Sequence, residues 1–144
     1  MTWTGLETFD TAVQKADLWL KEIMEELNTD SRRIAYMSLR AVLHTLRDRL
    51  LLDEAVDLGA QLPLLIKGIY YDEWKPSITP VKDRHIDEFL AHIKEKYRAD
   101  GTVDMEKTAR AVFTVLKKKI TEGEIKDVKG MLPEELKSLW GSPC

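Results

Sequence analysis

The sequence predicts an all-α protein in which a unit of about four helices occurs twice, and the two units pack as one pseudo-symmetric orthogonal bundle. Three observations lead to this prediction. Apolar residues recur at helical spacing in several segments, turn-forming residues and prolines separate those segments, and the chain matches itself when it is shifted by 70 residues. With 144 residues, 44% of them hydrophobic, the chain can form one small core.

The first half is expected to contain four helices. Residues 9–27 have six apolar residues at alternating spacings of four and three, namely Phe9, Val13, Ala16, Leu20, Ile23 and Leu27. Cap-forming residues at 28–31 precede a second helical pattern that ends near residue 51. Asp53-Glu54 can cap a short third helix that ends near Gly59, and Pro63 suits the first turn of a fourth.

An extended connector is expected at residues 72–80, because two prolines there disfavour helix in the residues before them. Helical spacing then returns in two apolar stripes, formed by Ile86, Leu90, Ile93 and Tyr97 and by Ala109, Val112, Phe113, Leu116 and Ile120. Asp100-Gly101 breaks the pattern between the two stripes. Thr121 to Glu124 has the spacing of a capping box, for a short helix that stops at Gly130.

The self-match at a shift of 70 residues predicts an internal duplication. It needs no gap and pairs apolar, charged and turn-forming residues at once. The matched pairs include Leu46 with Leu116, Glu54 with Glu124, Asp57 with Asp127, Leu62-Pro63 with Leu132-Pro133, and Tyr70 with Trp140. We therefore divide the chain into a first repeat (1–71), a connector (72–80), a second repeat (81–140) and a tail (141–144). Because a 70-residue unit buries little apolar surface, both repeats are expected to share one core.

Several motifs follow one another along the chain in a fixed order. They are Leu39 to Leu50 (LRAVLHTLRDRL), Gln61-Leu62-Pro63, Gly68 to Tyr71, Trp74-Lys75-Pro76, Gly123-Glu124, and Leu132 to Leu136 continuing to Trp140. Through these motifs the chain resembles, from about residue 8 to residue 140, the bacterial family catalogued as domain of unknown function 2267. The resemblance implies an all-helical, tandemly duplicated bacterial protein. It implies no particular activity and assigns no role to any residue.

Charge and cysteine content argue against several classes of protein. The chain carries 22 basic and 25 acidic residues, a formal charge of −3, so no bulk positive field attracts nucleic acid or anionic lipid. Its one cysteine, Cys144, allows no internal disulfide and suits a cytoplasmic location. No signal peptide pattern opens the chain, and no apolar stretch approaches the roughly 18 residues of a membrane span. We expect neither a secreted nor a membrane protein.

Histidines are the first candidates for chemistry. His85, Glu88 and His92 lie at i, i+3 and i+7, so on a helix they would share one side, as divalent metal ligands must. That side lies away from the apolar stripe, and the first half does not repeat the pattern, so a charged exposed face is favoured over a metal site. His44 is expected on the outer side of the second helix, where a lone histidine is seldom catalytic. We expect no catalytic residue, no metal and no cofactor.

A basic stripe is the next candidate. Arg33, Arg40 and Arg47 are spaced by seven residues along the outer side of the second helix, and Arg110 and Lys117 repeat the last two members. Such a stripe could contact the phosphates of a nucleic acid. The alternative is a solvated face that is balanced by neighbouring acidic residues.

Aromatic residues gather at the end of the first repeat. Tyr71 and Trp74 lie among three aromatic side chains within five residues, and such side chains often anchor a protein partner. In a tandem fold the favoured partner of this cluster is the other half of the same chain.

Together these observations favour a non-enzymatic protein-binding or regulatory module of bacterial origin, with an unidentified protein as its partner. Nucleic-acid binding through the basic stripe is a less favoured alternative. Small-molecule binding between the two repeats is another. No membrane association is expected.

Overall fold

The computed structural model describes residues 3–97 and 103–141 of the chain. These residues form eight α-helices and two short 3-10 helices, and no strand occurs among them. In chain order the elements are α1 (Glu7–Leu27), α2 (Arg32–Arg49), α3 (Leu52–Ala60), α4 (Leu64–Tyr71), η1 (Pro76–Ile78), α5 (Ile86–Tyr97), α6 (Met105–Lys119), α7 (Glu122–Gly130), α8 (Glu134–Lys137) and η2 (Ser138–Trp140). The predicted all-α class is confirmed.

Local sequence explains where several helices begin and end. The side chains of Ser31 and Asp104 each accept a 3.1 Å hydrogen bond from the backbone N–H three residues later. This satisfies a donor that the first helical turn leaves free. α1 ends at Asn28, whose φ of 55° lies in the left-handed region that asparagine tolerates. Pro63 and Pro133 directly precede α4 and α8, so both prolines mark the start of a helix, as predicted.

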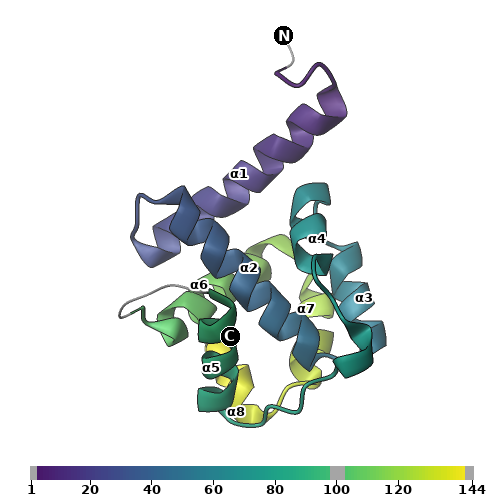
Figure 1. Cartoon of the computed structure of the whole chain (residues 1–144), viewed down its shortest axis with the longest axis vertical. Helices are drawn as coiled ribbons and strands as arrows, with labels where there is room; N and C mark the ends of the chain where they lie inside the picture. The colour runs from purple at the N-terminus through teal and green to yellow at the C-terminus, as the bar shows by residue number, and fades with distance from the viewer. Residues whose placement is uncertain (1–2, 98–102, 142–144) are drawn as a thin grey trace.

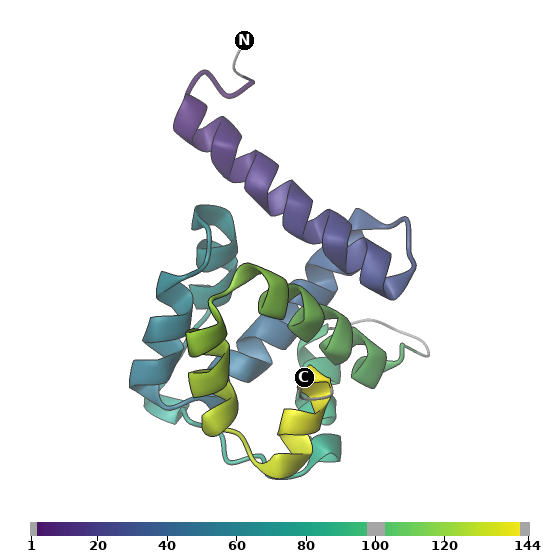
Figure 2. The same cartoon turned by 180° about the vertical axis from the view of Figure 1, so that it is seen from behind.

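Helix α2 runs through the centre of the molecule and contacts α1, α4, α5 and α6 (Figure 1). α1 packs on α2, α6 and α4, and its N-terminal end extends beyond the rest of the molecule. Seen from behind, α6, α7 and α8 cover the other side (Figure 2). Helices of the first and second halves of the chain contact one another in several pairs, including α2 with α5, α1 with α6 and α3 with α7.

One hydrophobic core contains residues from both halves of the chain. At its aromatic centre the rings of Trp140 and Phe113 are stacked with their centroids 4.1 Å apart, and the Phe89 ring lies 6.2 Å from that of Phe113. Leu46 and Leu116, which the apolar spacing predicts to be core residues, are both fully buried. The described residues of the two halves thus share a core.

The buried faces of α1 and α5 differ from the predicted stripes. Phe9 is 54% exposed, whereas Trp19, which lies outside the predicted stripe, is 4% exposed. On α5, Phe89 is fully buried and Leu90 only partly. The prediction for Phe9 is wrong because the N-terminal half of α1 projects past the elements that would cover it (Figure 1). In both helices a large aromatic side chain occupies the centre of the interface, one position from the predicted leucine.

The starts of α3 and α7 also differ from expectation. The N-cap of α3 is Leu51, so Asp53 and Glu54 lie within the first turn and do not cap it. At α7, the Thr121 hydroxyl accepts from the Glu124 N–H at 3.3 Å. The Thr121 N–H, however, donates to Gln61 Oε1 at 3.0 Å, where a complete capping box would use the Glu124 carboxylate. The capping box is therefore only half formed.

The connector at residues 72–80 is not extended throughout, because it contains the short 3-10 helix η1. The predicted break at Asp100-Gly101 and residues 142–144 of the predicted tail lie outside the described residues. No described helix is both long enough and apolar enough to cross a bilayer.

Helix bounds recur at an offset of 70 residues. α3 and α7 are both nine residues long and begin at residues 52 and 122. α4 and α8 begin at residues 64 and 134. Burial repeats with the same offset, because residues 54, 55 and 58 are buried in α3 and residues 124, 125 and 128 in α7.

Candidate functional site

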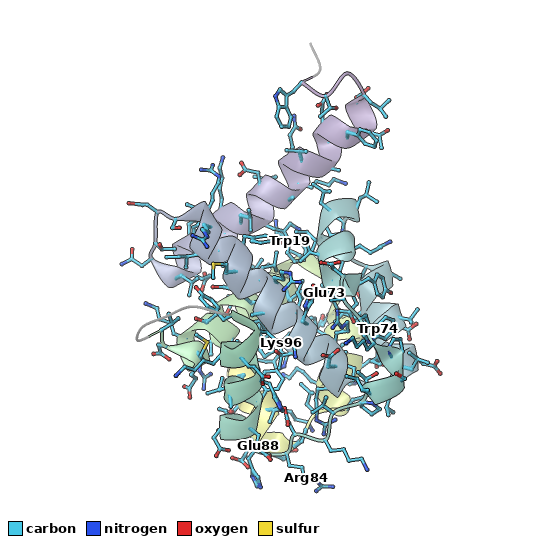
Figure 3. All side chains as sticks on the ribbon, in the orientation of Figure 1. Trp19, Glu73, Trp74, Arg84, Glu88 and Lys96 are labelled. Carbon is cyan, nitrogen blue, oxygen red and sulfur yellow. The ribbon has the colours of Figure 1, made fainter. Side chains whose placement is uncertain are left out.

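A groove of about 610 Å³ crosses the middle of the molecule between α2, the connector and α5. Most of its lining is polar or charged, and it comes from Arg40, His44, Arg47, Asp48, Glu73, Trp74, Lys75, Ile78, Glu95 and Lys96. In Figure 3, Glu73 and Trp74 lie to one side of α2 and Lys96 to the other. The groove thus brings together Arg40, Arg47 and Trp74 of the predicted partner-binding residues, and His44 lies beside them.

Arg40 lies at the wall of this groove and is paired with two acidic residues. Its Nη2 lies 3.4 Å from a carboxylate oxygen of Asp72 and 3.0 Å from one of Glu73. Glu73 has a φ of 58°, a left-handed backbone conformation that is uncommon for a residue with a side chain. The guanidinium is therefore neutralised by the connector itself.

Arg47 is buried and serves the main chain. It is 2% exposed, and its Nη1 donates to the carbonyls of Tyr70 at 2.7 Å and Asp72 at 3.0 Å, while Nε donates to Asp48 at 2.9 Å. The expected position on the outer side of α2 is wrong for this residue. The carbonyls at the end of α4 lack helical partners, and an arginine can satisfy several of them at once. This bonding leaves Arg47 inaccessible to a phosphate backbone.

His44 is also buried, in contrast to its expected surface position. Its Nε2 lies 2.6 Å from the carbonyl oxygen of Ile69. Burial lowers the pKa of His44 to about 4, and the positive charges of Arg47 and Arg40 act in the same direction. The imidazole is therefore neutral at pH 7, and its Nε2–H donates to the carbonyl.

The aromatic cluster packs within the first half of the chain. The rings of Tyr71 and Trp74 lie 5.5 Å apart, and the Tyr70 hydroxyl donates to the Ala55 carbonyl on α3 at 2.6 Å. Second-half residues also lie near the cluster, because Trp74 lines the 610 Å³ groove together with Glu95 and Lys96 of α5. The Trp74 Nε1–H is buried beside the groove and has no hydrogen-bond partner among the described residues.

The other predicted residues lie elsewhere. Arg33 is exposed near the start of α2. Arg110 on α6 donates to Glu106 at 3.1 Å and to the Ser138 carbonyl at 2.8 Å. Lys117 donates to the Trp140 carbonyl at 2.7 Å. Like Arg40 and Arg47, Arg110 and Lys117 therefore bond to groups of their own chain.

The two histidines of α5 and its N-terminus have separate acidic partners. His85 Nδ1 lies 2.6 Å from Glu135, and His92 Nδ1 lies 2.6 Å from Asp83. The Glu88 carboxylate accepts the backbone N–H groups of Arg84 and His85 at 3.1 and 3.0 Å. Hydrogen bonding to these N–H groups lowers the pKa of Glu88, and the hydrogen bond to Glu135 raises that of His85. Each of the three candidate metal ligands thus bonds to its own partner within the chain.

A second groove, of about 420 Å³, lies between the projecting half of α1 and the start of α4. Its lining comes from Glu7, Thr8, Thr11, Ala12, Lys15, Pro63 and Leu64. Leu64 in this lining is 56% exposed, and Phe9, on α1 next to the lining residue Thr8, is 54% exposed. Sequence reasoning missed this surface, because an apolar stripe identifies the face of a helix that seeks burial without indicating whether anything covers it.

Comparison with known proteins identifies the family of the chain. No curated protein matches it. The family model described as Uncharacterized conserved protein (DUF2267) matches residues 16–139. This range includes all of α2 to α8 and most of the residues of the shared core, so the chain belongs to the DUF2267 family.

Proposed function

We propose that the protein is a non-enzymatic interaction module of the bacterial cytoplasm, and that it binds a basic amphipathic helix of another protein along the projecting half of α1. One observation carries the proposal. The face of α1 that packs on the core at Trp19 and Ile23 continues toward the N-terminus through Ala12, which is still buried, to Phe9, which is 54% exposed. A helix from a partner could continue the same packing.

Exposed apolar side chains occur on both α1 and α4. Phe9 on α1 is 54% exposed, and Leu64 on α4 is 56% exposed. Leu6 and Leu65 add further exposed apolar area at the two ends. Grouped exposed apolar side chains, in contrast to isolated ones, are typical of interaction surfaces.

The charge of α1 favours a basic partner. Its projecting half, residues 7–16, contains two acidic residues, Glu7 and Asp10, and one basic residue, Lys15. Two copies of α1 packed side by side would bring like charges together, which disfavours a homodimer through this face. A helix with lysine or arginine beside its apolar stripe would complement both the apolar face and the charge.

The proposal includes an internal duplication. The 70-residue offset of α3 with α7, and of the starts of α4 and α8, supports it. So do matched side-chain roles, because Arg47 and Lys117 donate to the carbonyls of Tyr70 and Trp140. The projecting half of α1 precedes the segment that has a counterpart in α5, so the proposed binding face belongs to the first repeat alone.

Nucleic-acid binding receives less support than protein binding. Arg40, Arg47, Arg110 and Lys117 all bond to carboxylates or carbonyls of their own chain. A phosphate would have to displace these partners.

The proposal is tested by capture experiments with tagged, full-length variants. The bait proteins are the wild type, Phe9→Asp, and Ile78→Asp as a matched control, because Ile78 is 67% exposed and lies on η1, away from α1. Far-UV circular dichroism checks that all three are folded. A captured protein that survives nuclease treatment, stays with Ile78→Asp and falls by about tenfold with Phe9→Asp supports the proposal.

The second step uses the captured protein itself. A synthetic peptide of its basic amphipathic segment is titrated against the wild type, and we expect one-to-one binding that Phe9→Asp weakens by about tenfold. Capture that Phe9→Asp leaves intact contradicts the proposal. So does a concentration-dependent homodimer in sedimentation that Phe9→Asp abolishes.

Small-molecule binding between the halves is a second candidate, and the unpartnered Trp74 Nε1–H beside the 610 Å³ groove favours it. A small polar ligand with a hydrogen-bond acceptor could satisfy this donor. Thermal unfolding in the presence of a panel of polar metabolites tests this candidate. A stabilising compound should lose its effect with Trp74→Phe, and a panel without any stabilising compound counts against the candidate.

A further inference from the structure

Helices α3 and α7 pack against each other and bring together acidic residues from the two halves of the chain. One carboxylate oxygen from each of Glu54, Asp57 and Glu124 lies within 4.8 Å of the other two. Glu54 and Glu124 occupy the same position in their helices, the third residue of each. Three negative charges at this spacing repel one another unless something neutralises them.

Two of these carboxylates are buried and lack partners. Glu54 is 7% exposed and Glu124 is 8% exposed. The Oε2 atom of each is inaccessible to solvent and has no hydrogen-bond partner among the described residues. A buried, unpaired carboxylate is costly, so both atoms need a proton or a cation beside them.

The side chains around the cluster offer no such partner. Ion pairs form at many places in the described parts of the chain, but none involves Glu54, Asp57, Glu124 or Asp127. The buried Tyr70 hydroxyl donates to the Ala55 carbonyl and so is not available to Glu54.

The Glu124 carboxylate is also free of the structural role that its sequence position suggests. In a complete capping box it would accept the Thr121 N–H, but Gln61 Oε1 accepts that N–H at 3.0 Å. The Glu124 carboxylate is thus left to face Glu54 and Asp57, to which one of its oxygens lies within 4.8 Å.

We propose that Glu54, Asp57 and Glu124 form a binding site for a divalent cation of the size of Ca²⁺. Carboxylate oxygens are the ligands of hard cations, and Ca²⁺ takes them at roughly 2.3–2.6 Å. Oxygens up to 4.8 Å apart can therefore lie on opposite sides of one such ion. Asp57 is exposed, so water can reach the ion there and complete its coordination. The bound ion would join α3 of the first half to α7 of the second.

The test uses the full-length protein after treatment with a chelator, at an ionic strength of about 0.15 M to screen weak surface binding. Isothermal titration with CaCl₂, MgCl₂ and MnCl₂ measures binding, and thermal unfolding measures its effect on stability. We expect one Ca²⁺ per chain and a rise in Tm with Ca²⁺ concentration. Glu124→Gln and Asp57→Asn should each weaken Ca²⁺ binding by at least about tenfold.

Matched controls separate this site from general acidity. The controls are Asp53→Asn and Glu122→Gln. Asp53 lies next to Glu54 on α3, Glu122 lies in the first turn of α7, and both residues are exposed. These variants should bind Ca²⁺ within about twofold of the wild type. In the chelated protein, Glu124→Gln should unfold at a Tm close to that of the wild type, because the amide has the shape of the carboxyl group and carries no charge into the buried site. A Tm close to that of the wild type also shows that the variant is folded.

Two results would overturn the proposal. One is the absence of both binding heat and a Tm shift up to about 10 mM of each cation, which would leave a proton shared between Glu54 and Glu124 as the stabilising partner. The other is an equal loss of affinity in the control variants, which would indicate diffuse attraction to the acidic surface. Neither result bears on the α1 surface, since Phe9→Asp leaves this cluster untouched.

Discussion

Arg47 on α2 and Lys117 on α6, which are 70 residues apart, each donate to a main-chain carbonyl near the end of a later helix. Arg47 Nη1 lies 2.7 Å from the Tyr70 carbonyl oxygen, and Lys117 Nζ lies 2.7 Å from that of Trp140. Cations are favourable at helix C-termini, where carbonyls lack helical partners. Both basic residues therefore act as internal caps, and this role accounts for part of the basic stripe in the sequence.

Replacing Arg47 should destabilise the protein strongly. Arg47→Ala leaves the carbonyls of Tyr70 and Asp72 without a donor and Asp48 without its nearest cation. We expect a loss of about 2–5 kcal/mol in the free energy of unfolding, measured with urea. The control Arg33→Ala, at an exposed position on the same helix, should change it by less than about 0.5 kcal/mol. Equal effects of the two variants would contradict the capping role.

Leu46 and Leu116 should be equally important to the core. Both are fully buried, at matching positions of α2 and α6. Leu46→Ala and Leu116→Ala should each cost about 2–5 kcal/mol, through lost apolar contact and the cavity that remains. The same urea titrations measure this cost. A loss below about 1 kcal/mol at either site would show that its helix face is wrongly assigned.

The two ends of α1 should respond differently to truncated side chains. Trp19→Ala should cost about 3–5 kcal/mol, because Trp19 is 4% exposed within the core. Phe9→Ala should cost less than about 1 kcal/mol, because most of that ring is already in water. Thermal unfolding of both variants tests the contrast. A large loss with Phe9→Ala would mean that the N-terminal half of α1 packs on the body of the protein.

His44 should make stability depend on pH. Its pKa is about 4 in the folded protein, mainly because of burial, against an ordinary value of 6.5. The unfolded chain therefore binds the proton more readily, so the contribution is complete above pH 6.5 and is lost as the pH falls toward 4. We expect a loss of roughly 1–3 kcal/mol over this range, from urea titrations at several pH values.

Two variants isolate this effect. His44→Gln should flatten the pH dependence between 4 and 6.5. His85 is exposed, and its hydrogen bond to Glu135 raises its pKa, so its charged side chain stabilises the folded state at low pH. His85→Gln removes this contribution and should therefore make the stability fall more steeply as the pH is lowered. A pH profile that His44→Gln leaves unchanged would refute the assignment.

Gly59 should be required by the ring of Tyr71. A Cβ at Gly59 would overlap the end of this ring, with Cε2 only 3.0 Å away. Gly59→Ala should therefore cost about 1–3 kcal/mol and shift Tyr71 from its place beside Trp74. Gly68→Ala is the control, because nothing lies within 4 Å of its added Cβ. That variant should gain about 0.5–1 kcal/mol from helix propensity.

A double-mutant cycle checks the contact between Gly59 and Tyr71. In a Tyr71→Leu background, Gly59→Ala should lose most of its cost, because the ring that it meets is gone. If the cost persists unchanged in this background, the clash with Tyr71 is not its cause.

Much of the fold follows from the sequence, because apolar periodicity and helix punctuation are local signals. The helix pattern, the starts at Pro63 and Pro133, and the burial of Leu46 and Leu116 all follow from spacing. The exposure of Phe9 does not, because it depends on where α1 ends relative to the body of the protein.

The candidate sites were harder to predict. Arg47 has the spacing of a surface residue, and only the fold places the Tyr70 carbonyl, 23 residues later, beside it. The self-match pairs Glu54 with Glu124, but it contains no information about α3 packing on α7. The one signal for that cluster in the sequence was a glutamate that recurs at the same position of both halves.

The exchange of contacts between the two halves also bears on synthesis at the ribosome. α1 packs on α6 and α2 packs on α5, so the first half emerges with apolar surface that only later residues can cover. The core cannot close until Trp140, which stacks on Phe113 of α6, has left the exit tunnel. The first half therefore waits for the second during synthesis, and the nascent first half is the state in which a chaperone would meet this chain.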